Sequence, residues 1–411
     1  MPSPAFHLPL VSVVVTNYNY ARFLRDAVAT VDAQSYPRIE LVIVDDASTD
    51  DSAAVLDDIA QRAPSAKIIR LAENGGQTNA FRIGFAASAG EYVVFLDADD
   101  LLLPAFVETH IFTHLSLRAP VGFTTSDMLQ AYGTNIVVSG WMNLSAFAIS
   151  GRGALAGGLR RIDAAAPELW DFQSALPADI ESRIHLLPAD DWTAWVYAPT
   201  SGNCFRRDAL TLFLPHVGAA PDMRLRVHAD SYVNKAVCLM SGAALIDLPL
   251  TVYRIHGGNG LTGFAELSGL EAADREKSFR AEYNAWRAVA DRLVDAAETF
   301  IPRMSSQRYA RALATLQRAS VSSPEFPDYE SLTTYIETRL AERAGDLKTA
   351  LGDEKYALLV AGVVAARGGQ PRRKRLAPRP WMRPIAEFFL TFGRLLHLRG
   401  MRDLGERLWH F

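Results

Sequence analysis

Short β-branched runs alternate with amphipathic helical patterns over the first 120 residues, and this alternation restricts the fold more than any other feature. Apolar runs at 10–17, 39–46, 66–72 and 91–97 predict four strands, and the segments between them have helical spacing. Strands joined by helices of this length are typical of crossover units, in which the strands are parallel. We therefore expect an α/β fold with a mostly parallel sheet flanked by helices.

Polar and mostly acidic side chains follow each predicted strand at its carboxyl end. They are Thr16, Asn17, Tyr18, Asp45, Asp46, Glu73, Asn74, Asp97, Asp99 and Asp100. Ligands of open α/β sheets bind beyond these strand ends. The last three aspartates leave one apolar strand together, and like charges at that separation repel unless a positive group lies among them. The three aspartates therefore predict either a bound cation or a cationic partner, and since Mg²⁺ uses only one or two carboxylates, a compact D-x-D at a strand end suffices for a cation site.

The first predicted turn, "TNYNYARF", disfavours several nucleotide-binding classes. A dinucleotide-dependent dehydrogenase would have a G-x-G-x-x-G sequence here, and a P-loop NTPase would have a Walker A sequence. The turn contains neither. The glycine-rich, lysine-containing loop of a sugar-nucleotide pyrophosphorylase is also missing there. The composition, 49% hydrophobic and 21% charged, is ordinary for a soluble globular enzyme. Two cysteines, Cys204 and Cys238, favour a reducing compartment.

The remainder of the chain has fewer clear patterns. Between 123 and 197 no regular periodicity can be assigned. A short strand and helix are expected within 200–213, an amphipathic helix opens at Asp230, and 244–255 predicts one or two strands. After about residue 260 the pattern is helical, which predicts a helical extension behind the α/β part.

Four stretches resemble the inverting family-2 glycosyltransferases of GT-A fold: "VSVVVTNYNYARFL", "IELVIVDDASTDDS", "NGGQTNAFRIGFAASAGEYVVFLDADDLLLP" and "HADSYVNKAV…YRIHGGN". The resemblance is specific over about the first hundred residues and looser after Ala198. It implies a GT-A catalytic domain at 1–260, with a nucleotide-binding half at 8–120 and an acceptor half at 121–260. A helical region at 261–370 and a basic amphipathic segment at 371–411 would follow.

The resemblance also implies roles for individual residues. The nucleotide pocket would be formed by Thr16, Tyr18, Asp46, Gly76 and Asp97. Asp46 would accept a hydrogen bond from the ring N–H of uracil. Asp99 would bind a divalent cation, Mn²⁺ or Mg²⁺, and His256 would supply a further ligand or a diphosphate contact. Asp230 occupies the position of the catalytic base.

These roles fit the chemistry of sugar transfer. A divalent cation stabilises the charge on a diphosphate leaving group, and a carboxylate within reach removes the proton of the acceptor hydroxyl. The resemblance thus implies metal-dependent hexosyl transfer from a nucleotide sugar, taken as a UDP-sugar, to a glycan or lipid-linked acceptor in cell-surface polysaccharide synthesis. A non-catalytic GT-A-like scaffold that binds a nucleotide or glycan is the alternative.

Some interpretations stay open at the level of sequence. Asp230 also suits a helix cap, and Asp190 or Asp191 could be the base in its place. His256 also suits a structural histidine near a strand end. The aromatic residues Trp192, Trp195 and Tyr197 suit either stacking on an acceptor sugar or a place in the core.

The carboxyl-terminal end carries a charge opposite to that of the rest. Residues 367–411 contain 11 Lys or Arg against 3 Asp or Glu, although the whole chain has a net charge of −4. Apolar residues recur at helical spacing over 385–396, which suits an anionic membrane interface or a docked terminal helix. No signal peptide or membrane span is apparent, so we expect a cytoplasmic protein, peripheral on the cytoplasmic face of the membrane. The basic patch is short, and nucleic acid is not an expected partner.

Overall fold

The computed structural model describes residues 7–140, 144, 147, 176–189, 196–214, 228–259, 275–318 and 330–365. Within these ranges, one ten-stranded sheet has the order β3-β2-β1-β4-β9-β6-β10-β5, with β7 paired to β6 and β8 to β10. The strands are β1 (Val11–Asn17), β2 (Ile39–Asp45), β3 (Lys67–Arg70), β4 (Tyr92–Asp97), β5 (Leu101–Leu102), β6 (Phe123–Tyr132), β7 (Asn135–Val138), β8 (Ile184–Leu187), β9 (Asn203–Arg206) and β10 (Ala243–Ile255).

The four strands predicted in the first hundred residues form a parallel unit, as expected. Strand β1 pairs in parallel with both β2 and β4, and β2 pairs in parallel with β3. Every residue of β1 is buried. A strand covered on both faces needs apolar side chains on both, which explains why valines occupy four of the first five positions of β1. The expected fold class, a mostly parallel α/β sheet flanked by helices, is confirmed.

The second half of the sheet contains a central strand that periodicity did not indicate. Strand β6 pairs in parallel with β10, and β9 lies antiparallel between β4 and β6. Two antiparallel pairings in succession make β6 and β10 run in the same direction as β4. The carboxyl ends of β1, β2, β4, β6 and β10 therefore lie along one edge of the sheet. The segment expected to hold one or two strands forms the single strand β10.

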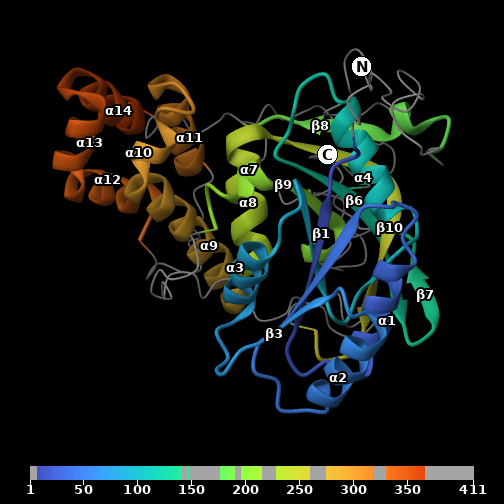
Figure 1. Ribbon diagram of the computed structural model, residues 1–411. Coiled ribbons are helices and arrows are strands. Elements are labelled where there is room, and N and C mark those ends of the chain that lie inside the picture. Colours follow the sequence, from blue (N-terminus) through green and yellow to red (C-terminus); the bar gives the residue numbers. More distant parts are fainter. Residues whose placement is uncertain are drawn as a thin grey trace, which may run out of the picture.

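Helices cover both faces of the sheet (Figure 1). On one face α1 (Ala21–Asp32), α2 (Ser52–Arg62) and α4 (Phe106–Ser116) bury a core that includes Val13 and Val15 of β1. On the other face α3 (Gln77–Ala87) and α8 (Ala229–Ser241) pack in the cluster that contains Val14. Successive side chains of a strand point to opposite faces, so β1 contributes to both cores. The short helix α7 (Arg207–Leu210) follows β9.

A group of helices extends the domain beside α8 (Figure 1). They are α9 (Arg275–Asp295), α10 (Ala297–Phe300), α11 (Ser306–Arg318), α12 (Leu332–Glu342), α13 (Ala344–Leu351) and α14 (Asp353–Ala365). Lys235 of α8, only 2% exposed, bonds to Glu282 of α9 at 2.7 Å, and Trp286 donates to the same carboxylate at 3.0 Å. The expected helical extension is thus present and is joined to the sheet domain through α8.

None of the helices in the described ranges has both the length and the apolarity needed to cross a membrane. The basic segment at 371–411 lies outside the described residues, and its interpretation as a membrane-contacting helix stays a prediction.

Candidate active site

The acidic residues noted in the sequence gather at the carboxyl edge of the sheet. Strand register sets Thr16 beside Asp97, and Asn17 beside Asp45. Asp99 and Asp100 follow β4 directly in the sequence. Side-chain oxygens of Asp97, Asp99 and Asp100 lie within 4.8 Å of one another. The three carboxylates therefore form one cluster, which we call the acidic rim.

Neutral donors hold two of the three carboxylates of the acidic rim. Gln77 Nε2 and Thr16 Oγ1 donate to Asp97 Oδ1 at 2.8 and 3.2 Å. Ser201 Oγ donates to Asp100 Oδ2 at 2.6 Å, and the backbone N–H of Arg254 is 3.3 Å from Asp100 Oδ1. These contacts orient the carboxylates but bring no positive charge to them.

Burial, together with repulsion between the carboxylates of the acidic rim, raises the pKa of Asp97 and of Asp100. Burial, the Asp99 carboxylate and the Asp230 carboxylate raise the pKa of Asp97 to about 7, against the lowering effect of the Gln77 hydrogen bond. Burial together with Asp99 and Asp97 raises the pKa of Asp100 well above its ordinary value. Repulsion of this kind is relieved by a cation, and an all-oxygen donor set is the one that Mg²⁺ and similar hard cations prefer. The residues present therefore fit a divalent cation.

His256 bridges Asp99 and a cation on helix α1. Its Nε2 lies 3.0 Å from Asp99 Oδ2, and Arg22 Nη2 lies 3.3 Å from its Nδ1. The backbone N–H of Gly258 also points at Nδ1, at 3.3 Å. Because Nδ1 faces two donors, the hydrogen-bond network assigns it as the acceptor, and Nε2–H then donates to Asp99. His256 is thus fixed as a neutral donor toward the acidic rim.

The side chain of Arg254 is committed to the backbone beneath the acidic rim. Its guanidinium donates to the carbonyl groups of Asp99 and Phe23 and pairs with Asp26 at 2.9 Å. It also lies over the Phe23 ring, 4.5 Å from the centroid. With its donors engaged in this way, Arg254 anchors the loop after β4, and we assign it a structural role.

The expected nucleotide residues lie around the neighbouring strand end. Asp46 is 3% exposed, and its two carboxylate oxygens accept from the backbone N–H groups of Gly75 and Gly76, both at 2.8 Å. Gly76 has φ +83°, a conformation that glycine adopts without strain, and it is the residue before α3. Tyr18 is 46% exposed. The loop before α3, the Asp46 carboxylate and an exposed aromatic ring thus occur together at the same edge as the acidic rim.

Asp45, which the sequence placed beside Asp46, is engaged within the fold. Its carboxylate accepts from Asn17 Nδ2 at 2.6 Å and from the hydroxyl and N–H of Ser48 at 2.6 and 3.2 Å. The contacts tie the turn after β1 to the turn after β2 and leave Asp46 as the residue of the pair that faces the glycine loop.

Asp230 lies in the first turn of α8, and its negative charge affects the pKa of Asp97 in the acidic rim. The N-cap position of α8 is His228, whose side chain makes no capping hydrogen bond, so Asp230 does not occupy the cap position that the alternative interpretation gave it. Asp230 Oδ1 accepts from the N–H of Ser231 at 2.6 Å. The Asp230 charge is among the causes that raise the pKa of Asp97, so the two carboxylates lie near enough to repel one another. The fold therefore brings Asp230 and Asp97, distant in sequence, to one site.

The remaining candidates divide into core residues and residues that are not described. Tyr197 is 1% exposed within the hydrophobic core, which supports its structural interpretation. Asp190, Asp191, Trp192 and Trp195 lie outside the described residues.

Sequence reasoning missed several residues that complete the site: Tyr20, Arg22, Gln77, Ser201 and Arg254. Tyr20 hydrogen-bonds to Asp99, and burial, followed by the charges of Asp99 and Asp97, raises the pKa of its hydroxyl. Tyr20 and Arg22 lie in the turn "TNYNYARF", from which only Thr16, Asn17 and Tyr18 were selected as candidates. Their position directly after the first strand was a signal that they face the same edge.

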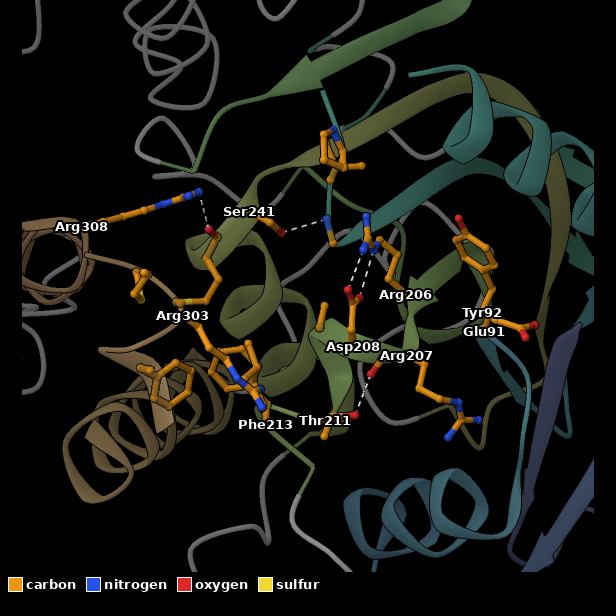
Figure 2. Close-up of a pocket in the computed structure, with 18 residues that line it drawn as sticks. Glu91, Tyr92, Arg206, Arg207, Asp208, Thr211, Phe213, Ser241, Arg303 and Arg308 are labelled. Carbon is orange, nitrogen blue, oxygen red and sulfur yellow. Dashed lines mark hydrogen bonds and ion pairs between the residues drawn. The ribbon is translucent and has the colours of Figure 1, made fainter. Parts of the chain in front are cut away.

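A cavity of about 1130 Å³ lies at the opposite edge of the sheet (Figure 2). Its walls include Glu91 at the start of β4 and Arg206 at the end of the antiparallel strand β9. Arg206 pairs with Asp208 at 2.5 Å, and Arg308 of α11 donates to the carbonyl of Met240 at 2.9 Å (Figure 2). The cavity marks the junction between the sheet domain and the helical extension, and none of the expected site residues lines it.

Comparison with known proteins gives a consistent family match. Residues 12–119 match the family described as "Glycosyl transferase family 2". An uncharacterized glycosyltransferase of Nostoc sp. is 32% identical over 249 residues, which cover 61% of this chain and 66% of that protein. A putative teichuronic acid biosynthesis glycosyltransferase of Bacillus subtilis is 32% identical over 126 residues, 31% of this chain and 50% of that protein. The chain therefore spans less than two thirds of the length of these relatives.

Two solved structures give weaker likenesses. Staphylococcus aureus TarS in complex with UDP-GlcNAc has a TM-score of 0.41 at 16% identity, covering 89% of this chain and 93% of that chain. The mannosyltransferase PcManGT of Pyrobaculum calidifontis, in complex with GDP-Man and Mn²⁺, has a TM-score of 0.40 at 17% identity, covering 90% of this chain and 88% of that chain. At these scores the likeness carries no information about individual residues.

Proposed function

Residues 12–119 belong to glycosyltransferase family 2, and from this premise we propose that the protein transfers a sugar from a nucleotide-diphosphate donor, a UDP-sugar, to a glycan or lipid-linked acceptor. The observation that carries the proposal is the clustering of Asp97, Asp99 and Asp100 at the strand edge that also bears Asp46. Three carboxylates this close together repel one another unless a cation lies among them, and this repulsion supports a bound cation.

In the proposed site, Asp99 and its neighbour Asp97 would hold a divalent cation, which supplies positive charge to the diphosphate leaving group. The hydrogen bonds from Gln77 and Thr16 keep Asp97 turned toward this position. His256 was expected to ligate the cation or to contact the diphosphate. The donor that it presents to Asp99 supports a positioning role, since ligation through Nε2 would require the proton to move to Nδ1, where Arg22 already donates.

The nucleotide would lie over the neighbouring strand end in this proposal. Asp46 already orders the loop of Gly75 and Gly76, and each carboxylate oxygen keeps a second lone pair that can accept from a uracil N–H. The exposed ring of Tyr18 offers a face for the base, and Thr16 lies beside Asp97 between base and cation.

We assign Asp230 as the base that takes the proton of the acceptor hydroxyl. Its place in the first turn of α8, where it acts on the acidic rim, supports this role. Attack of the acceptor oxygen on the sugar carbon from the face opposite the diphosphate would invert the configuration in a single step. A second carboxyl acid, as in glycoside hydrolysis, is not needed because the diphosphate leaves as a stabilised anion.

The acceptor is proposed from the names of relatives. The Bacillus subtilis relative is named for teichuronic acid biosynthesis, and a Myxococcus xanthus relative, 34% identical over 128 residues, is named for O-antigen biosynthesis. Both support a role in cell-surface polysaccharide synthesis. We retain a cytoplasmic location at the membrane surface as part of the proposal, on the basis of the 11 Lys or Arg against 3 Asp or Glu in 367–411.

Turnover of sugar nucleotides tests the proposal against a non-catalytic scaffold. We expect a thermal-shift screen with Mn²⁺ to select a UDP-sugar, and slow hydrolysis of that donor to occur without any acceptor. Binding without hydrolysis, under conditions in which the screened donor saturates the protein, would favour the scaffold.

A further inference from the structure

Arg22 lies beside the acidic rim as a cation without a carboxylate partner. It is exposed in the first turn of α1, donates to His256 Nδ1 at 3.3 Å and lies over the Phe23 ring, 4.4 Å from its centroid. Within the described part of the chain no carboxylate is within ion-pair distance of its guanidinium, whereas Arg25, on the same helix, pairs with Asp58 at 3.4 Å. A guanidinium has five N–H donors, so Arg22 keeps several for a ligand.

His256 links the Arg22 guanidinium to Asp99, the residue proposed to hold the cation. Only the imidazole of His256 separates its guanidinium from Asp99, because the other ring nitrogen lies 3.0 Å from Asp99 Oδ2. The ring of His256 is itself held between Tyr20, at 5.4 Å, and Phe23, at 4.8 Å. Stacking on Phe23 restricts the Arg22 side chain before a ligand arrives, which reduces the entropy lost on binding.

We propose that Arg22 binds the diphosphate of the nucleotide donor on the side of His256 away from Asp99, an inference that rests on the proposed function. A planar guanidinium offers paired N–H groups that match two phosphate oxygens, and this contact is stronger than the one it makes with a neutral imidazole nitrogen. A diphosphate that bridges toward a cation at Asp99 would therefore meet a positive group on each side.

The proposed contact also serves the transfer step. As the bond between the sugar carbon and the diphosphate oxygen breaks, its electron pair stays on that oxygen, while the acceptor oxygen bonds to the carbon and its proton passes to the base. Negative charge grows on the diphosphate, and a fixed guanidinium stabilises it more in the transition state than in the bound donor. Loss of Arg22 should therefore lower both diphosphate affinity and turnover.

Calorimetric titration with ligands of different charge tests this inference. We expect Arg22→Gln to weaken UDP binding by about tenfold, the size of one charge-assisted contact, and to leave uridine binding unchanged. Arg22→Lys keeps the charge but loses the planar fork, so it should fall between wild type and Arg22→Gln. The matched control is Arg25→Gln on the same helix, which should bind UDP as the wild type does.

The titration results distinguish a failure of the role of Arg22 from a failure of the proposed function. If wild type binds UDP and Arg22→Gln binds it equally well, or if uridine affinity falls as much as UDP affinity, the role of Arg22 is refuted while the proposed function stands. If wild type binds neither UDP nor GDP in the presence of Mn²⁺, both fail together. A selective loss of UDP binding, with folding verified by circular dichroism, supports the inference.

Discussion

Replacing Asp99 by asparagine should stabilise the metal-free protein while it removes cation-dependent donor binding. After burial, the charge of Asp99 makes the largest contribution to the raised pKa of both Asp97 and Asp100, so its carboxylate is a source of repulsion in the folded state. Asparagine keeps the shape and an oxygen that can accept from His256 Nε2–H, so the local structure should persist.

The size of this effect follows from the geometry of the acidic rim. Two unit charges within 4.8 Å repel by about 3 kcal/mol at an effective dielectric constant of about 20. The raised pKa values of Asp97 and Asp100 favour their neutral forms, which removes part of that repulsion, so we expect a gain of about 1–2 kcal/mol. For a chain of 411 residues, the corresponding rise in Tm is roughly 1–2 °C.

Differential scanning fluorimetry with and without Mn²⁺ checks both halves of this prediction. Wild type should gain stability with Mn²⁺ and UDP, whereas Asp99→Asn should start higher and gain little. A metal-free variant that melts below wild type would show that Asp99 stabilises the fold, and an undiminished Mn²⁺ shift would show that the cation binds elsewhere. Either result would overturn the electrostatic account of the acidic rim.

Three further predictions concern the base, the ion pair that joins the helical extension, and pH. Asp230→Asn should keep donor affinity and lose turnover by at least about 10²-fold in acceptor assays, as for loss of a general base; near-normal transfer would move the base elsewhere, first to Asp191. Glu282→Gln removes the carboxylate that pairs with the 2%-exposed Lys235 and should lower the unfolding free energy by about 3 kcal/mol in urea titrations, more than Lys235→Met, which leaves a half-exposed carboxylate; equal losses would contradict this asymmetry. Burial lowers the pKa of His114 to about 4, so below its ordinary value of 6.5 the unfolded chain binds a proton that the folded chain does not. Stability should therefore fall from pH 6.5 toward 4 by up to about 1.4 kcal/mol per pH unit from this group, and a His114→Gln variant that keeps the same slope would exclude it.

The strands of the first hundred residues were predictable because each is a short, mainly apolar run next to a segment with helical spacing. Strand β6 was not, because it begins with buried polar residues whose partners come from elsewhere. His110 Nδ1 bonds to Thr124 Oγ1 at 2.6 Å, and the N–H of Ala198 donates to Thr125 Oγ1 at 3.0 Å. Polar groups satisfied by tertiary contacts are stable in a core, but they leave no periodicity in the sequence.

The sequence by itself determined the parallel strands and the acidic residues that follow them at one edge of the sheet. Both follow from local patterns and from the direction of the chain. Only the tertiary structure decided which groups surround those charges. His256 reaches Asp99 across 157 positions, and Arg22 and Asp230 approach from two different helices. Side-chain distances of a few ångströms depend on how β10, α1 and α8 pack against the sheet, and no periodicity within any one of these segments records that packing.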